Sequence, residues 1–389
     1  MNSRRRKLLR EVLSCPTSPF CERAVIEYVQ NWARRRGVSF AQDAAGNVLL
    51  SAGAGADGGP SRGRGKGKRR RAGRDEPTWV FTAHMDHPGF VVTGRRGRVV
   101  RAEFRGGVAK EYFPGSRVRL IVRDGPEHVA TVTSARKSKP HGFVACRLEL
   151  ARPADVPPGS VGMWDVPVFA SRRGRISARA CDDLAGVAAV LAALEETISR
   201  GAGGRVLGLL TRAEEVGFVG ALAGCRLGTI PAGALIVGIE TSKAQPAAKL
   251  GGGVVIRVGD KSRVFHEPLT AHVRAVAADL AKRNRRFRYV RQLMPGGTCE
   301  STAFCTLGFA AAAVCVPLGN YHNQHPRGHI AAETIDESDF DSLVALLAAL
   351  ADDARTPADT DAKLRRRLDD LLATRQGLLD EPGPWSPRQ

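Results

Sequence analysis

Short apolar runs alternate with longer helix-like stretches along most of the chain. Four runs have the composition of buried strands, and their sequences are TWVF, RVLGLLT, ALIVGI and AAAVCVPL. Helical patterns occupy residues 8–36, 184–199, 269–283 and 337–354. Strands that alternate with helices indicate βαβ units and a mainly parallel sheet. The pattern therefore predicts an α/β fold with three layers, α/β/α.

The segment 94–170 has a different pattern. Short alternating stretches such as RVRLIVRDG and HVATVTSA lie between glycines and prolines, and no helical repeat is visible. This is typical of a small β-domain, either a barrel or a sandwich. We therefore predict a large domain built from 1–93 and 171–355, an inserted barrel-like domain at 94–170, and a C-terminal helix and tail at 356–389.

Length and composition agree with this division. A chain of 389 residues with 43% hydrophobic residues can form one large domain and a smaller one. No run of ~18 uncharged apolar residues occurs, and the basic N-terminus lacks an apolar core, so we expect neither a membrane span nor a signal peptide. The eight cysteines form no C-x-x-C pair, which suits reduced thiols in a cytoplasm. Cys299 and Cys305 are only weak candidates for metal ligands.

The net charge of +20 comes in part from the segment 61–74, whose sequence is SRGRGKGKRRRAGR. It is rich in glycine and arginine and has no apolar periodicity, which predicts a disordered surface insertion. The alternative is a tether for nucleic acid or another anionic surface. However, no aromatic residue is interleaved for base stacking and no nucleic-acid-binding motif appears. We therefore expect no nucleic-acid partner.

Potential metal ligands follow each of the four strand-like runs. In chain order these are His84 with Asp86, Glu214 with Glu215, Glu240, and His322. The pair Asp182-Asp183 opens the helix-like stretch 184–199 and is a fifth candidate. The carboxyl ends of parallel strands meet at one edge of a sheet, where ligands bind. Two imidazoles and several carboxylates at that edge predict a site for two metal ions, and hence a dinuclear metallohydrolase.

The spacing of these residues suggests individual roles. His84 and Asp86 are two positions apart in an extended segment and point to the same face. Asp86 can therefore accept the second ring N–H of a metal-bound His84. The adjacent carboxylates of Glu214 and Glu215 repel each other unless a positive charge lies between them. Such a pair can divide into one metal ligand and one general base.

Two of the candidates leave alternatives open. Asp182 and Asp183 precede a helix, where a carboxylate can also act as an N-terminal cap. His322 lies in the segment GNYHNQHPRGH, in which His325 and His329 are alternatives for the last ligand.

The ordered motifs AHMD, ACDDLAGVAAVLAAL, TRAEEVGFVGA, VGIETS and NYHN resemble those of the dinuclear zinc exopeptidase clan. His84 and Asp182 are 98 positions apart, whereas Glu215 and Glu240 are 25 apart. The branch of the clan that inserts its small domain before the bridging aspartate is the tetrahedral-aminopeptidase, or glutamyl-aminopeptidase-like, family. The chain resembles this branch over roughly residues 8–350.

The resemblance implies an aminopeptidase that acts on short peptides with two divalent ions per subunit, zinc first and cobalt or manganese as alternatives. By motif position it makes His84 and Glu240 ligands of one ion, Glu215 and His322 ligands of the other, and Asp182 the bridge. Glu214 would be the general base, Asp86 would orient His84, and the Asp182–Asp183 peptide bond would be cis. Relatives form dodecamers, which implies a homo-oligomer.

The chain departs from the family pattern in segments that we expect to shape the substrate pocket. His87 stands where relatives usually carry Glu, and Leu184 where they usually carry Arg. The late motif Gly-Gly-Thr-Asp reads GGTCE, so Glu300 either replaces the missing acid and meets a substrate α-amine or is an ordinary carboxylate at a helix start. His322 also lies in NYHN rather than in a His-Ser-Pro context.

Two other functions remain as alternatives. An amidohydrolase or deacylase would use the same two-metal site on an acylated or non-peptide amide. A basic binding protein with a vestigial hydrolase fold would carry a broken ligand set, whereas all five ligand positions are intact in this sequence.

Overall fold

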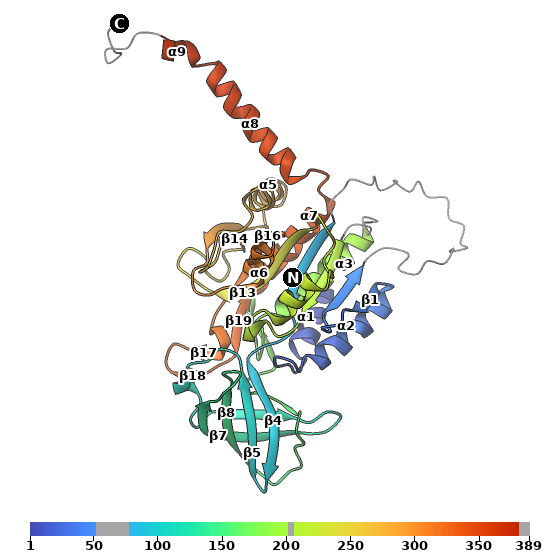
Figure 1. The fold of residues 1–389 in the computed structure, drawn as a ribbon, viewed down its shortest axis with the longest axis vertical. Coiled ribbons are helices and arrows are strands. Elements are labelled where there is room, and N and C mark those ends of the chain that lie inside the picture. Colours follow the sequence, from blue (N-terminus) through green and yellow to red (C-terminus); the bar gives the residue numbers. More distant parts are fainter. Residues whose placement is uncertain (52–77, 201–205, 381–389) are drawn as a thin grey trace, which may run out of the picture.

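The computed structural model describes residues 1–51, 78–200 and 206–380. The predicted basic insertion 61–74 lies outside these residues. A sheet covered by helices forms the body of the molecule, a small β-barrel lies at one end, and one long helix projects from the other end (Figure 1). The predicted fold class, α/β with an inserted β-barrel, is confirmed. The predicted domain boundaries stay predictions.

The central sheet has eight strands in the order β1-β2-β12-β3-β13-β16-β14-β15. Their bounds in that order are Ser39–Gln42, Val48–Ser51, Val206–Thr211, Trp79–His84, Leu235–Lys243, Ala310–Leu318, Val254–Gly259 and Tyr289–Leu293. The four middle strands β12, β3, β13 and β16 are parallel. Strand β2 pairs antiparallel to β12, and β14 pairs antiparallel to β16. The carboxyl ends of four parallel strands therefore share one edge.

Helices cover both faces of the sheet, because its inner strands are apolar on both sides. Those on one face are α1 (Ser3–Leu13), α2 (Arg23–Arg36), α3 (Leu184–Ser199), α5 (Glu267–Arg283) and α7 (Glu337–Asp352). Those on the other are α4 (Val219–Arg226) and α6 (Glu300–Thr306). In β3, Phe81 packs into the first core and its neighbour Val80 into the second.

The barrel is closed by six strands in the order β4-β5-β8-β7-β6-β9. Their bounds in that order are Gly89–Arg96, Val99–Arg105, Val144–Leu150, Glu127–Lys137, Arg117–Ile121 and Val161–Trp164. Phe90, Phe104, Phe113 and Trp164 fill its interior, and the ring centroids of Phe90 and Phe104 are 4.9 Å apart. Strand β4 begins shortly after β3 ends at His84, so the barrel is attached next to the predicted site.

The remaining elements lie at the edges of this framework. A small sheet joins β10 (Phe169–Arg172), β11 (Arg175–Ala178) and β19 (Glu333–Asp336), and β17 (Gln324–His325) forms a hairpin with β18 (His329–Ile330). Short 3-10 turns are η1 (Lys110–Tyr112), η2 (Glu214–Val216) and η3 (Tyr321–Asn323). Helices α8 (Pro357–Ala373) and α9 (Gln376–Asp380) end the described chain. In the described ranges, no helix has the length and apolar character needed to cross a membrane.

The aromatic interior of the barrel leads to a stability prediction. Phe104 is fully buried against Phe90, Phe113 and Trp164. Phe104→Ala should lower the free energy of unfolding by about 3–5 kcal/mol, because it removes these contacts and leaves a cavity. Equilibrium denaturation followed by circular dichroism measures the change. Val99→Ala, on the exposed side of the same barrel, is the control and should change it by less than about 0.5 kcal/mol. Equal effects of the two substitutions would contradict the packing described here.

Candidate active site

The predicted ligands converge at the carboxyl edge of the parallel strands. His84 is the last residue of β3, Glu240 lies in β13, Glu214 and Glu215 form the turn η2 after β12, His322 lies in η3 after β16, and Asp182 stands just before α3. The pairing of Thr211 with His84 aligns the ends of β12 and β3. Residues that are far apart in the sequence are thus brought to one place.

Asp182 lies between the two imidazoles. Its Oδ1 is 3.5 Å from Nε2 of His84, and its Oδ2 is 3.7 Å from Nε2 of His322. The other ring nitrogen of each histidine faces a backbone carbonyl: Nδ1 of His84 is 3.1 Å from that of Asp86, and Nδ1 of His322 is 2.6 Å from that of Gly107. When Nδ1 donates to these carbonyls, each Nε2 directs a lone pair toward Asp182, as a metal ligand must.

The other acidic side chains complete two overlapping groups of potential ligands. Oε1 of Glu215 is 3.1 Å from Nε2 of His322. His84, Glu214 and Glu240 form one group, and His84, Asp182 and Glu215 form the second; in each, the ligand atoms lie within 4.8 Å of one another. This places both members of the Glu214-Glu215 pair at the centre of the site.

The site holds more buried negative charge than its histidines can balance. Burial raises the pKa of Glu214 well above its usual range, and the nearby Glu240 and Glu215 add to this effect. Burial also raises the pKa of Glu240, to about 8. Burial acts on Asp182 in the same direction, but the imidazoles of His84, His322 and His87 outweigh it and lower the pKa of this carboxyl. Oδ1 of Asp182 has no hydrogen-bond partner within the described chain. A donor set of imidazole and carboxylate with this excess charge fits divalent cations.

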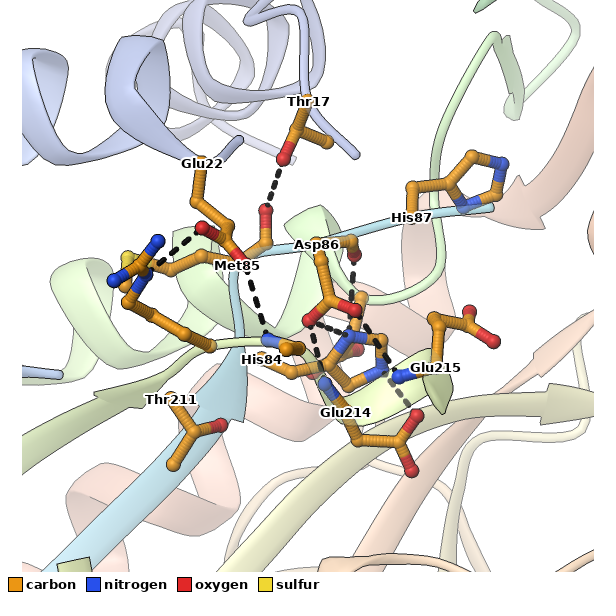
Figure 2. A network of polar contacts seen from close by, with 12 residues as sticks. Thr17, Glu22, His84, Met85, Asp86, His87, Thr211, Glu214 and Glu215 are labelled. Carbon is orange, nitrogen blue, oxygen red and sulfur yellow. Dashed lines mark hydrogen bonds and ion pairs between the residues drawn. The ribbon is translucent and has the colours of Figure 1, made fainter. Parts of the chain in front are cut away.

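Asp86 connects the end of β3 to the turn that carries the two glutamates (Figure 2). Its Oδ1 accepts a hydrogen bond from the backbone N–H of Glu214 at 2.9 Å, and its Oδ2 accepts one from Glu215 at 3.0 Å. Its Oδ1 is also 3.5 Å from Nδ1 of His84. The carboxylate of Asp86 therefore contacts both the His84 ring at the end of β3 and the glutamate turn after β12. The backbone carbonyl oxygen of Asp86 is the nearer acceptor for the His84 ring.

Glu22 supports the same turn, a role that sequence reasoning missed. The side chain is completely buried, and its Oε2 accepts from Nε of Arg212 at 2.8 Å while its Oε1 accepts from the backbone N–H of Ala213 at 3.1 Å (Figure 2). Ala213 has a positive φ of 52°, which a non-glycine residue adopts only when its surroundings hold it. Glu22 thus fixes the backbone immediately before Glu214. In the sequence it is one acid at the start of a helix, where acids are common.

Glu333 in β19 is a second support that sequence reasoning missed. Its Oε2 accepts hydrogen bonds from the backbone N–H groups of Cys181 at 2.7 Å and Asp182 at 3.0 Å. Its Oε1 accepts from the N–H of His322 at 2.8 Å. One buried carboxylate therefore holds both the residue between the imidazoles and one of the imidazole-bearing turns.

His87 lies behind Asp182. Its Nδ1 is 2.6 Å from the carbonyl oxygen of Asp182, and its Nε2 is 3.0 Å from Oδ1 of Asn323. The Asp182–Asp183 peptide bond is cis, as the resemblance implied. His87, where the family usually has a Glu, thus braces the backbone of Asp182 and does not line the cavity in front of it.

A cavity of about 440 Å³ opens over the cluster. Its wall includes the six charged residues of the cluster together with Gly107, Lys243, Arg257, Met294, Gly296, Gly297, Thr298 and Tyr321. Arg257 is 97% removed from solvent, and its Nη1 is 3.3 Å from the hydroxyl oxygen of Ser242. Of the segments that depart from the family pattern, the loop 296–298 and the NYHN segment, through Tyr321 and His322, line this cavity. His87 and Leu184 are buried and do not line it.

The competing candidates lie elsewhere. The rings of His325 and His329 stack on each other with centroids 4.2 Å apart and are not part of the cavity wall. Glu300 is buried at the start of α6, where its Oε2 accepts a hydrogen bond from Thr211 at 2.9 Å, and it does not line the cavity either. Within the described chain, Cys299 and Cys305 belong to neither group of potential metal ligands.

Comparisons with known proteins agree with this geometry. A family model described as M42 glutamyl aminopeptidase matches residues 67–346. A search of curated proteins gives no match.

Several solved structures share the fold. A TET1 peptidase of Pyrococcus horikoshii, described as able to assemble into a tetrahedron or a large octahedral shell, has a TM-score of 0.69 and 22% identity over 89% of this chain and 99% of its own. An aminopeptidase of the archaeon Desulfurococcus kamchatkensis has a TM-score of 0.69 and 19% identity over 92% and 97%. A TET aminopeptidase from a marine sediment Thaumarchaeota archaeon has a TM-score of 0.71 and 17% identity over 92% and 100%.

The hydrogen bonds of Glu333 predict that it controls metal affinity. Glu333→Gln replaces an acceptor oxygen with an amide donor, so one of the N–H groups of Asp182, Cys181 or His322 loses its partner. Affinity for divalent metal should fall by about 10–100-fold, as for other supports of metal ligands. Calorimetric titration with Zn²⁺ measures it.

Asp336→Asn is the matched control for this experiment. Asp336 ends the same strand, and its Oδ1 also accepts a backbone N–H, from Ser338 at 2.8 Å, but the residue lies outside the site. Its replacement should leave metal affinity unchanged. An unaltered affinity in Glu333→Gln would refute the role of Glu333.

Proposed function

Because the chain belongs to the M42 glutamyl aminopeptidase family, we propose that its clustered side chains hold two divalent ions and that peptides lose their N-terminal residue at this centre. The protein is a metal-dependent aminopeptidase, and the family predicted from the order of its motifs is confirmed. The amidohydrolase alternative is not favoured by this membership. The vestigial binding protein required a damaged ligand set, and every candidate ligand is present in the sequence and lines the same cavity.

The position of Asp182 is the observation that carries this proposal. Its two oxygens face the Nε2 atoms of different histidines, at 3.5 and 3.7 Å. A carboxylate in this position suits a bridge between two cations. His84 and Glu240 would hold the first ion and His322 and Glu215 the second, and Asp182 would be shared by both. Zinc is our first choice, with cobalt and manganese as alternatives, because imidazole and carboxylate ligands accept all three.

Glu214 is the residue that we propose to move the proton. Two divalent ions bound here would polarise the scissile carbonyl and lower the pKa of the attacking water. Glu214 is buried, and burial keeps its pKa well above the usual range of a glutamate. Its carboxylate can therefore accept a proton from water and then release it to the amine of the departing peptide. Asp86 accepts a hydrogen bond from the backbone N–H of Glu214 and so fixes the backbone from which the Glu214 side chain extends.

The cavity indicates the class of substrate. A volume of about 440 Å³ accommodates the end of a short peptide and excludes a folded chain. Lys243 and Arg257 in its wall provide positive charge for a substrate carboxylate. The cavity therefore supports a short peptide as substrate, and the family supports a free amino end on that peptide.

Assembly and location are proposed on separate grounds. The TET1 peptidase, which shares the fold, is described as able to assemble into a tetrahedron or a large octahedral shell, and this supports a homo-oligomer for the present chain. The eight cysteines are free thiols, which supports a reducing compartment such as the cytoplasm.

Replacing Asp182 tests the proposed metal bridge. Asp182→Asn should lower aminopeptidase activity by more than about 100-fold and reduce the number of bound ions, because an amide is a poorer ligand than the carboxylate. Mass spectrometry of a digested pool of short peptides gives the activity, and elemental analysis gives the ions per chain. Asp183→Asn is the control, since Asp183 accepts from Gly186 N–H as a helix cap and Asn is an equally good cap.

The same digest separates the aminopeptidase from the amidohydrolase. Wild-type protein should remove residues stepwise from free amino ends and leave N-acetylated copies of the same peptides intact. Cleavage of the acetylated copies alone would overturn the proposed substrate.

Substitutions in the glutamate pair test the division of roles. Glu214→Gln should lower kcat by about 10²–10⁴-fold and leave two ions bound, because it removes a proton acceptor and keeps the shape of the side chain. Glu215→Gln should instead lower the metal content. Kinetics and elemental analysis on both variants decide the matter. Loss of an ion from Glu214→Gln would make Glu214 a ligand, as its grouping with His84 and Glu240 also allows.

A further inference from the structure

Helix α8 extends away from the body of the protein (Figure 1). It lies beyond residues 67–346, the part matched by the family model. Its base is anchored: Thr356 forms a capping box with Asp359, and Nδ1 of His272 on α5 is 2.9 Å from the hydroxyl of Thr360. None of the side chains of α8 is buried against the rest of the described chain. The helix therefore has a fixed base and an unsupported length.

One face of α8 is apolar. Leu364, Leu368, Leu371 and Leu372 are 54%, 55%, 40% and 54% exposed. At 3.6 residues per turn these positions fall within an arc of about 100°. A helix of this length is marginally stable alone in water, and most helices depend on packing of their apolar face. The leucine face of α8 thus lacks the packing partner that would stabilise the helix.

The charges on this segment argue for a protein partner. Residues 357–380 contain five acidic and five basic side chains, so their net charge is zero. Nucleic acids and anionic membranes attract helices with a net positive charge. Balanced charges around an apolar stripe are instead typical of helices that pair with other helices.

The order of the charges selects a second copy of the same helix in antiparallel orientation. Asp361 precedes the leucines within α8, and Arg375 follows them in the turn just after the helix ends at Ala373. Continued at the same helical spacing, both positions lie on the side of the apolar face. In a parallel pair Asp361 would face Asp361 and Arg375 would face Arg375. In an antiparallel pair each faces the opposite charge. The body lies at the N-terminal end of α8, so an antiparallel pair also places the two bodies at opposite ends (Figure 1).

We propose that α8 pairs with α8 of a second copy of this chain, in antiparallel orientation, through the stripe Leu364, Leu368, Leu371 and Leu372. This contact is formed outside the family fold and does not depend on the activity of the metal site. It joins two copies, or two assemblies, by a projecting arm.

The test compares two double variants of the full-length protein. Leu368→Asp/Leu371→Asp places two charges in the stripe. Ala362→Asp/Ala373→Asp places the same two charges on the opposite face of the same helix. Sedimentation velocity over a range of micromolar concentrations should show a particle mass at least twofold lower for the leucine variant than for wild type and the control. Hydrogen exchange should show amide protection of α8 in wild type and control and its loss in the leucine variant, because unpaired α8 is marginal.

Every other outcome overturns the proposal. A monomeric wild type with rapidly exchanging α8 amides would show that the stripe is uncovered. Unchanged mass and protection in the leucine variant would show that another surface is used. Loss of protection without a change in mass would show that α8 packs on its own chain. Co-sedimentation of a monomeric wild type with phosphatidylserine vesicles would identify a membrane as the occupant.

The orientation has its own test. Asp361→Arg and Arg375→Asp should each weaken association, since each creates like-charge contacts in an antiparallel pair. A mixture of the two variants should restore the mass of wild type, because each chain then meets the opposite charge. If neither single variant lowers the mass, the antiparallel arrangement is wrong. Peptidase activity should be unchanged in all these variants and serves as the control for folding.

Discussion

The confinement of several carboxylates at one buried edge of the sheet is the constraint on which the rest of the structure depends. Burial and mutual repulsion oppose the charge of Glu214 and Glu240, and the imidazole of His84 offsets only part of it. Such a cluster keeps its geometry only if residues outside the cluster hold the backbone of each member in place. Asp86 and Glu22 do this for the glutamate turn, and Glu333 does it for Asp182 and His322. The supports are acids that bind backbone N–H groups, so the chemistry of the supports resembles that of the ligands.

The inserted barrel is a part of this site as well as an appendage of the fold. It follows β3 directly after His84, and its loop before η1 returns to the site, where the carbonyl of Gly107 meets the ring of His322. Further along, the hydroxyl of Tyr112 donates to the carbonyl of His325 at 2.9 Å. The barrel therefore sets the orientation of a histidine that is more than two hundred positions away in the sequence.

Sequence patterns were sufficient for those parts that depend on local periodicity. Strands such as TWVF and ALIVGI end next to His84 and Glu240, so the period of apolar residues and the rule for parallel strand ends indicate the cluster. The supports could not be found in this way, because Glu22 and Glu333 act through backbone groups that any residue provides. His87 was expected to affect the substrate pocket, and its contact with the carbonyl of Asp182 depends on a loop path that no spacing rule predicts. The apolar stripe of α8 is visible in the sequence, but only the structure shows that no part of the described chain packs against it.

The contact between Gly107 and His322 links the position of the barrel to the protonation of a proposed metal ligand. The carbonyl of Gly107 selects which ring nitrogen of His322 carries the hydrogen, and therefore which one faces Asp182. A small displacement of the barrel would remove this acceptor. The His322 ring could then adopt the other tautomer, in which Nε2 carries the hydrogen and points it toward the carboxylate of Asp182. Interdomain angle and metal occupancy are then thermodynamically linked, and the linkage is reciprocal. An ion bound by His322 would therefore favour the position of the barrel in which Gly107 contacts His322.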